Sequence, residues 1–278
     1  MVVRKRFGQH FLHDPAVIRR IVDAVGPARG ERLVELGPGR GALTWTLLER
    51  AGHMDAIEID RDLAGLLVAD PRAQGHLRVH VESMLDTDFT RLQGDGPKLR
   101  IVGNLPYNIS TPMLFRLLRQ RSAVADIHFM LQKEVVDRMS ASPGGKDYGR
   151  LTVMLAAYAE IAALFDVGPG AFRPRPKVWS ALVRLRPNAE PRFAIGNDAA
   201  LRSLVTAAFS HRRKILRNGL KGLLSAADIE ACEIDSQLRP ETLSPAQFGR
   251  LASHYCQLQR GADAQDLDVR ASAGVQGR

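Results

Sequence analysis

Residues 32–44 form an apolar run that enters a glycine-rich loop, reading Arg32-Leu33-Val34-Glu35-Leu36-Gly37-Pro38-Gly39-Arg40-Gly41-Ala42-Leu43-Thr44. The apolar run predicts a short buried strand, and a helix is expected to follow through about Leu48. Glycine lets the backbone approach a ligand closely, and the free N–H groups at the start of a helix attract anionic groups. The stretch therefore predicts an α/β fold with a ligand loop, although a glycine turn that binds nothing has the same appearance.

The next predicted strand, residues 54–60, carries an acid at the distance expected for a nucleoside-binding fold. Glu58 follows the loop by about 20 residues, and a carboxylate there can accept both hydroxyls of a ribose. Ala42 can replace the third glycine of the dinucleotide-binding pattern. These residues predict a nucleoside cofactor, either a nicotinamide dinucleotide or S-adenosylmethionine.

Two further predicted strands end in polar residues that should lie at the same edge of the sheet. Residues 77–81 lead to Glu82, which could take the adenine amine of a cofactor. The other strand runs into Ile101-Val102-Gly103-Asn104-Leu105-Pro106-Tyr107-Asn108-Ile109-Ser110, where Pro106 predicts a turn and residues 110–112 predict the start of a helix. In open α/β sheets, ligands bind at this end of the strands.

The turn at residues 104–107 suits a flat base that carries an exocyclic amine. The Asn104 side-chain oxygen and the Leu105 carbonyl could each accept one N–H, beside a stacking Tyr107 ring and with Pro106 stiffening the turn. Holding both hydrogens out of plane would localise the nitrogen lone pair, which makes it a nucleophile without a general base. No His or Lys for hydride transfer follows this strand, which favours methyl transfer over dehydrogenation. The tetrapeptide alone is equally compatible with a turn that buries its Tyr.

A proline-rich segment, residues 168–177, combines an aromatic residue with three cations. Alternating prolines predict an extended chain, led by Phe172 and carrying Arg173, Arg175 and Lys177. An aromatic ring and cations match a base and its flanking phosphates. A surface loop with a half-buried Phe is the alternative interpretation. Residues 180–185 alternate as a last strand.

The chain becomes helical in pattern after Pro187, and a basic region begins. No acid lies between Asp198 and Asp228, a span that contains Arg202, Arg212, Arg213, Lys214, Arg217 and Lys221. A solvated helix face normally mixes charge signs, so this one predicts phosphate binding. We expect a first domain over residues 1–187, a helical RNA-binding domain over 188–260 and a disordered tail over 261–278.

Composition agrees with a polyanionic partner and excludes several classes of protein. The 278-residue chain has a net charge of +9, although a proteome rich in Arg would raise the charge without a functional reason. Two cysteines imply neither a disulfide framework nor a cysteine zinc site, and the eight histidines form no ligand cluster. The N-terminus lacks the apolar core of a secretory signal, and no apolar run is long enough to span a bilayer. We expect a cytoplasmic protein that binds neither metal nor membrane.

Several motifs together resemble the small-subunit ribosomal RNA adenine dimethyltransferase family, over roughly residues 4–260. They are Arg6-Phe7-Gly8-Gln9-His10-Phe11-Leu12, Glu35-Leu36-Gly37-Pro38-Gly39, Asn104-Leu105-Pro106-Tyr107-Asn108-Ile109, Phe172-Arg173-Pro174-Arg175-Pro176-Lys177-Val178 and Arg212-Arg213-Lys214. The resemblance implies a Rossmann-like class I methyltransferase domain with a seven-stranded sheet and a small C-terminal α-helical domain. It implies transfer of methyl groups from S-adenosylmethionine to N6 of two adjacent adenosines in the 3′-terminal hairpin of 16S rRNA. This would occur late in 30S subunit biogenesis, by a protein that is a monomer off the ribosome.

The resemblance also assigns roles to individual residues. It implies cofactor contacts at His10, Leu12, Gly37, Glu58, Glu82 and Asn104, a target-adenine site at Asn104, Leu105, Pro106, Tyr107 and Phe172, and rRNA contacts at Arg173, Arg175, Lys177, Arg212, Arg213, Lys214 and Arg217. The chain departs from the family pattern in three places. His10 stands where many members have Asn, Glu82-Ser83 replaces Asp-Ala, and Trp179 replaces an acid.

Two alternatives to this function share part of the same evidence. A large-subunit rRNA adenine methyltransferase that confers macrolide resistance would have the same first domain, but the Phe172–Lys177 loop and the basic helices speak against it. A non-catalytic ribosome-assembly factor would need only the basic helices, and the intact turn at residues 104–107 argues for catalysis instead.

Overall fold

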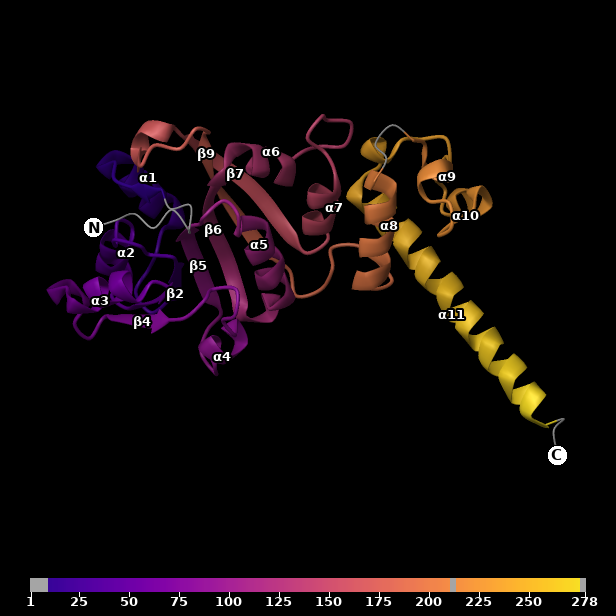
Figure 1. The fold of residues 1–278 in the computed structure, drawn as a ribbon, viewed down its shortest axis with the longest axis horizontal. Helices are drawn as coiled ribbons and strands as arrows, with labels where there is room; N and C mark the ends of the chain where they lie inside the picture. The colour runs from indigo at the N-terminus through magenta and orange to yellow at the C-terminus, as the bar shows by residue number, and fades with distance from the viewer. Residues whose placement is uncertain (1–9, 211–213, 276–278) are drawn as a thin grey trace. The chain divides into compact units, whose positions relative to one another are not determined.

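The computed structural model describes residues 10–210 and 214–275, with side chains through residue 261. Within these ranges the chain forms two compact units: residues 10–140 with 159–189, and residues 141–158 with 190–210 and 214–275. The first unit holds the sheet and the second is helical (Figure 1). The sequence predicts one first domain that runs without interruption through residue 187. The structure differs, because residues 141–158 leave the sheet unit and cluster with the helices.

The large sheet has seven strands, the number that the family resemblance implies. Their order in space is β4-β3-β2-β5-β6-β9-β7. The strands are β2 (Arg32–Leu36), β3 (Met54–Glu58), β4 (Leu77–Val81), β5 (Leu99–Asn104), β6 (Val124–Gln132), β7 (Ala159–Val167) and β9 (Ser180–Pro187). Strands β2 to β6 are parallel, and β9 is antiparallel to both of its neighbours, β6 and β7. A second, two-stranded sheet pairs β1 (Phe11–Leu12) with β8 (Phe172–Arg173).

Helices flank the large sheet in the first unit. They are α1 (Pro15–Val25), α2 (Thr44–Ala51), α3 (Arg61–Ala69), α4 (Phe89–Gln93), α5 (Ser110–Arg119) and α6 (Lys133–Met139), with short 3₁₀ turns η2 (Pro71–Ala73), η3 (Arg121–Ala123) and η4 (Pro169–Ala171). The crossovers through α2 and α3 run from β2 toward β4, whereas the crossover through α5 runs the opposite way, from β5 to β6. Right-handed crossovers in opposite directions place their helices on opposite faces. The direction changes between β2 and β5, which is where such folds bind ligands.

Helix α1 illustrates how local sequence defines an element. The Asp14 carboxylate accepts hydrogen bonds from the Ala16 and Val17 amides, and Pro15 occupies the first turn, where no amide is needed. Gly26 ends the helix in the left-handed conformation at φ 55°. The helix buries its apolar side in a core that also contains Leu12, Phe172 and residues of β2, β5, β6 and β9.

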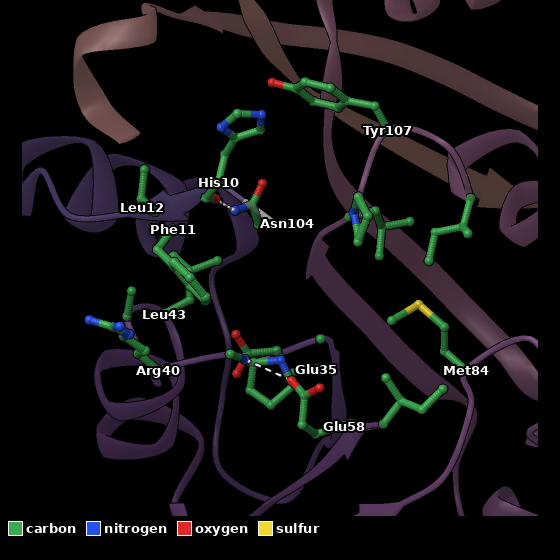
Figure 2. A pocket seen from close by; sticks show the side chains of 18 of the residues that line it. His10, Phe11, Leu12, Glu35, Arg40, Leu43, Glu58, Met84, Asn104 and Tyr107 are labelled. Atoms are coloured by element: carbon green, nitrogen blue, oxygen red, sulfur yellow. Dashed lines mark hydrogen bonds between the residues drawn. The ribbon is translucent and has the colours of Figure 1, made fainter. Parts of the chain in front are cut away.

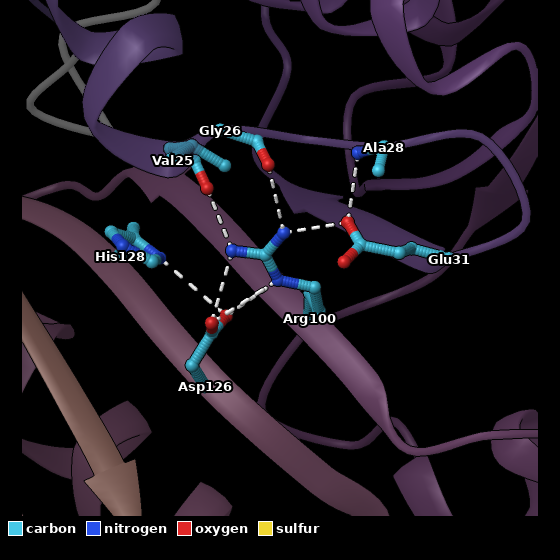
Figure 3. Close-up of polar contacts among 7 residues, drawn as sticks. All are labelled: Val25, Gly26, Ala28, Glu31, Arg100, Asp126 and His128. Carbon is cyan, nitrogen blue, oxygen red and sulfur yellow. Dashed lines mark hydrogen bonds and ion pairs between the residues drawn. The ribbon is translucent and has the colours of Figure 1, made fainter.

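Arg100 of β5 joins α1 to the amino ends of the strands (Figure 3). Its guanidinium donates to the Val25 carbonyl at 2.7 Å and the Gly26 carbonyl at 3.3 Å, the carbonyls that end α1. It also donates to Glu31 at 2.6 Å and pairs with Asp126 of β6 at 3.0 Å. Burial alone would raise the pKa of Asp126, but contacts with His128 and Arg100 outweigh it and lower that pKa. The cluster ties α1 to the amino-terminal ends of the strands. The carboxyl ends of β2, at Leu36, and of β5, at Asn104, lie at the opposite edge of the sheet.

The helical unit contains α7 (Arg150–Ala156), α8 (Asp198–Ser210), α9 (Leu216–Gly219), α10 (Ala226–Ala231) and α11 (Pro245–Val275), with the 3₁₀ turn η5 (Pro240–Thr242). Helix α7 packs against α8 and α11, and the Tyr148 hydroxyl donates to the Leu243 carbonyl at 2.7 Å. Helix α11 covers most of the segment for which the sequence analysis expects a disordered tail. That segment contains no proline, and its repeated alanines favour a helix.

Candidate active site

A cavity of about 240 Å³ opens at the carboxyl ends of β2, β3 and β5 (Figure 2). The strand register aligns these ends, since Leu36 pairs with both Ile57 and Gly103. The cavity therefore lies where the strand order changes direction, between β2 and β5. Its lining comprises His10, Phe11, Leu12, Glu35, Gly37, Pro38, Gly39, Arg40, Ala42, Leu43, Glu58, Ile59, Ser83, Met84, Leu85, Asn104, Leu105, Pro106, Tyr107, Asn108 and Ile109.

The glycine loop after β2 forms one wall of the cavity through close backbone packing. Gly37 and Gly39 adopt positive φ angles of 67° and 58°, which residues with a side chain rarely adopt. A Cβ atom on Gly37 would lie 3.3 Å from the methyl of Met84, and one on Gly39 would lie 3.0 Å from the Phe11 ring. A side chain at either position would collide with these neighbours. Because glycine has none, the backbone of the loop stays accessible to a ligand in the cavity.

Glu58 lies at the end of β3, buried and held by two backbone amides. Its carboxylate accepts from Gly39 N at 3.1 Å and from Asp60 N at 3.0 Å. Burial raises the pKa of Glu58, and these hydrogen bonds partly oppose the rise. The side chain is thereby fixed against the glycine loop, at the position that the sequence analysis assigns to a ribose.

Glu35 is a second buried acid in the cavity wall, and the sequence analysis gives it no role. It is 2% exposed and accepts a hydrogen bond from the Thr44 hydroxyl at 2.6 Å. Burial, opposed by the Thr44 hydrogen bond and assisted by the nearby charge of Glu58, raises the pKa of Glu35 to about 7. An acid inside an otherwise apolar strand is rare, because burying a charge is costly, and this was the signal in the sequence.

The third strand contributes differently from the sequence prediction. Glu82 is exposed, and its carboxylate accepts from the Thr87 hydroxyl at 3.0 Å rather than lining the cavity. The following residues, Ser83, Met84 and Leu85, line it instead. The strand ends at Val81 as the sequence predicts, and the Glu82 side chain lies against Thr87 in the loop that follows.

The turn after β5 brings together Asn104, Leu105, Pro106 and Tyr107, as its sequence predicts. The Asn104 side-chain nitrogen donates to the His10 carbonyl at 3.0 Å (Figure 2). That bond uses the donor end of the amide and leaves its oxygen as an acceptor. The orientation of the Asn104 amide depends on the position of His10, which immediately precedes β1. The Nδ1 atom of the His10 ring lies 2.7 Å from the Pro174 carbonyl oxygen, and this contact holds His10 in place.

Tyr107 presents its ring to the cavity, whereas Phe172 does not. The Tyr107 hydroxyl lies 3.0 Å from the Ser180 hydroxyl, and its ring centroid is 5.7 Å from that of His10. Phe172 is 2% exposed, because its pairing with Leu12 places it in the core beside α1. The structure therefore does not bring Phe172 to the face of the cavity opposite Tyr107, and the expected sandwich of two rings is not formed.

The expected RNA contacts are exposed where the structure describes them. Arg173, Arg175 and Lys177 are exposed in the first unit, and Lys214 and Arg217 are exposed in the helical unit. Arg212 and Arg213 lie outside the described residues, as do residues 1–9 of the basic N-terminal motif.

The cavity fits a nucleoside with a charged, flexible extension. Fixed Glu58 suits ribose hydroxyls, Leu12, Ile59 and Met84 supply apolar surface for a base, and the glycine loop gives backbone access. Within the described ranges, no group of three or more His, Cys, Asp or Glu side chains is placed to hold a metal ion. The helices searched in those ranges include none both long and apolar enough to cross a bilayer.

Comparison with known proteins gives consistent matches along the chain. The family model for ribosomal RNA adenine dimethylase matches residues 2–257. A ribosomal RNA small subunit methyltransferase A from Pseudomonas aeruginosa is 52% identical over 255 residues, covering 92% of this chain and 95% of the relative. The protein of that description from Nitrosococcus oceani is 52% identical over 259 residues, covering 92% of this chain and 97% of the relative.

Two crystal structures share the fold over most of their length. A dimethyladenosine transferase from Plasmodium falciparum superposes with a TM-score of 0.75 and 25% identity, covering 87% of this chain and 96% of that one. The 23S rRNA methyltransferase ErmE gives a TM-score of 0.68 and 26% identity, covering 88% and 99%. Since the family model spans nearly the whole chain and full-length relatives are half identical to it, the chain belongs to the ribosomal RNA adenine dimethylase family.

Proposed function

We propose that this protein methylates N6 of two adjacent adenosines in the 3′-terminal hairpin of small-subunit (16S) rRNA, late in assembly of the 30S subunit. Family membership supports the reaction class and S-adenosylmethionine as the donor. The relatives named for the small ribosomal subunit support the choice of RNA. The observation that carries the chemistry is the Asn104 amide, whose nitrogen is bound to the His10 carbonyl.

The target amine would be held by two acceptors in one turn. With its nitrogen engaged, Asn104 offers its oxygen, and Leu105 offers a backbone carbonyl next to it. Accepting both N–H hydrogens outside the base plane removes the nitrogen lone pair from the ring and concentrates it for attack. Tyr107 would stack on the base, with its ring held through the Ser180 hydroxyl. An adenine paired inside a duplex cannot enter such a site, so the substrate adenosine must be accessible or flipped.

The donor would occupy the rest of the cavity. Glu58 would accept the ribose hydroxyls, and His10, Leu12, Gly37 and Asn104 would surround the remainder. When bound, S-adenosylmethionine supplies a methyl carbon that is electrophilic because it is attached to a positively charged sulfur. The contact predicted for Glu82 stays a prediction: one oxygen of its carboxylate accepts from Thr87, and the adjacent Ser83 lines the cavity.

The exposed cations would position the RNA rather than read its sequence. Arg173, Arg175 and Lys177 belong to the unit that holds the cavity, and Lys214 and Arg217 belong to the helical unit. Phosphate contacts of this kind fix orientation and make binding depend on salt. We propose that the helical unit binds rRNA and that the protein acts as a monomer off the ribosome.

The test is methylation of 30S subunits from a strain that lacks this modification, with labelled donor and mapping of the modified positions. We expect label only at the two adjacent adenosines near the 3′ end. Label in 50S subunits, or macrolide resistance in an expressing strain, would instead identify a large-subunit enzyme. Binding to 30S subunits without donor binding by calorimetry would identify a non-catalytic assembly factor.

A further inference from the structure

Trp179 is an aromatic side chain that the structure leaves exposed beside the basic loop. It is 56% exposed, and its neighbour Val178 is 42% exposed. Phe172, the aromatic residue from which the sequence predicts stacking in this segment, is 2% exposed. The segment between β8 and β9 therefore still presents one large ring to solvent, but from its C-terminal end.

The Trp179 ring stands on a fixed support. Its backbone carbonyl accepts from the Lys133 amide at 2.9 Å, which anchors it to the start of α6. The edge of its ring lies over Gly168, since a Cβ atom built there would be 3.7 Å from two ring carbons. The following residue, Ser180, is buried and contacts the Tyr107 hydroxyl at 3.0 Å. Trp179 is thus one residue from the group that holds the cavity tyrosine.

The charges around Trp179 favour a polyanion over an apolar protein partner. Arg173, Arg175 and Lys177 are exposed in the same segment and precede the ring at every second position. Lys133, whose amide anchors the Trp179 backbone, pairs with Asp137 at 3.1 Å and Asp166 at 3.2 Å and so offsets one of their two negative charges. An exposed ring next to a row of cations is the arrangement that stacks a base and holds its phosphates.

We propose that Trp179 stacks on an rRNA base adjacent to the target adenosine, while Arg175 and Lys177 bind the phosphates beside it. The inference rests on the proposed function, because it assumes an RNA substrate. The target base itself would remain with Tyr107.

The first experiment compares steady-state methylation of 30S subunits by the wild type, Trp179→Ala, Trp179→Tyr and the matched control Val178→Ala. Loss of one stacked base should raise KM for the subunit about tenfold for Trp179→Ala, with little change in kcat. Trp179→Tyr keeps a ring and should retain most of the affinity, and Val178→Ala should match the wild type. Donor affinity, measured by calorimetry, should be the same in all four proteins.

The second experiment uses Trp179 as its own probe. In Trp45→Phe, Trp179 is the single remaining tryptophan, and stacking should quench its fluorescence when a 3′-terminal 16S rRNA fragment binds. Quenching by the RNA fragment together with a raised KM for Trp179→Ala supports the proposal. Unquenched emission at saturating RNA overturns it, and if KM for 30S subunits still rises, the partner is a ribosomal protein. Absence of methylation by the wild type would contradict the proposed function itself, separately from the role of Trp179.

Discussion

Asn104 is the residue on which the proposed chemistry depends, because its oxygen is one of two acceptors for the amine. Asn104→Ala removes that acceptor and the bond to the His10 carbonyl. Loss of one such polar contact to the reacting group should lower kcat about 10²- to 10³-fold. Single-turnover methylation of 30S subunits measures the effect. Val178→Ala, an exposed substitution outside the cavity lining, controls for nonspecific effects of a substitution. Equal activity of the Asn104 variant and the wild type would contradict the mechanism.

Glu35 predicts a pH dependence of stability. The pKa of its carboxyl is raised from 4.5 to about 7 in the folded protein, so the folded state keeps a proton that the unfolded chain releases. The free energy of unfolding should therefore fall as pH rises between 4.5 and about 7, and level off above. Glu35→Gln should remove a contribution on the order of 3 kcal/mol to this fall. Urea unfolding at several pH values measures it, and parallel curves for both proteins would show that Glu35 is not the cause.

The sequence predicts where a residue lies when its position depends on the local backbone, but not when its position depends on packing between distant segments. The turn at residues 104–107 and the position of Glu58 follow from strand ends, which local pattern predicts. Phe172 was expected at the site because it is aromatic, but pairing of β1 with β8 places it in the core. That pairing joins segments about 160 residues apart, and no local pattern encodes it.

Two of the three glycines in helix α11, Gly249 and Gly261, should respond oppositely to substitution. A Cβ on Gly249 would lie 2.3 Å from the Ala194 carbonyl oxygen and 2.5 Å from the Phe193 ring, whereas a Cβ on Gly261 meets nothing within 4 Å. Gly249→Ala should lower the free energy of unfolding by about 2 kcal/mol, because the close approach leaves no room. Gly261→Ala should raise it by up to about 1 kcal/mol, through helix propensity. Chemical denaturation measures both, and a stabilising Gly249→Ala would mean that α11 does not pack there.

At the level of elements, the sequence predicts five of the seven strands of the large sheet, but not their order in space. The strand expected at residues 180–185 is confirmed as β9 (Ser180–Pro187). Its insertion between β6 and β7 is a matter of pairing between distant segments. Likewise, the apolar residues of 150–156 indicate burial, and only the structure shows that α7 packs on α8 and α11 rather than on the sheet unit.

At the scale of the whole molecule, the helical unit is built from two separate segments of the chain, residues 141–158 and the described residues from 190 onward. This arrangement predicts how a shortened chain should behave. A protein that ends at residue 187 retains residues 141–158 but loses their partners, including Leu243 for the Tyr148 hydroxyl and Asp198 for the Tyr158 hydroxyl. Leu151, Val153 and Leu155, buried in the full chain, would then face water. We expect rapid proteolysis within residues 141–158 and aggregation. Replacing these residues by a flexible linker of equal length should restore solubility, and a soluble, protease-resistant 1–187 chain would contradict the division.

The antiparallel strand β9 also has a consequence for synthesis on the ribosome. Strand β7 is made before β9, yet in the described chain its hydrogen-bonded neighbour is β9 alone. Until residues 180–187 emerge, the nascent protein holds β6 with an open edge and β7 without a place in the sheet. The methyltransferase unit must therefore complete its sheet in a single late event, during which unpaired edges are most vulnerable to association with other nascent chains.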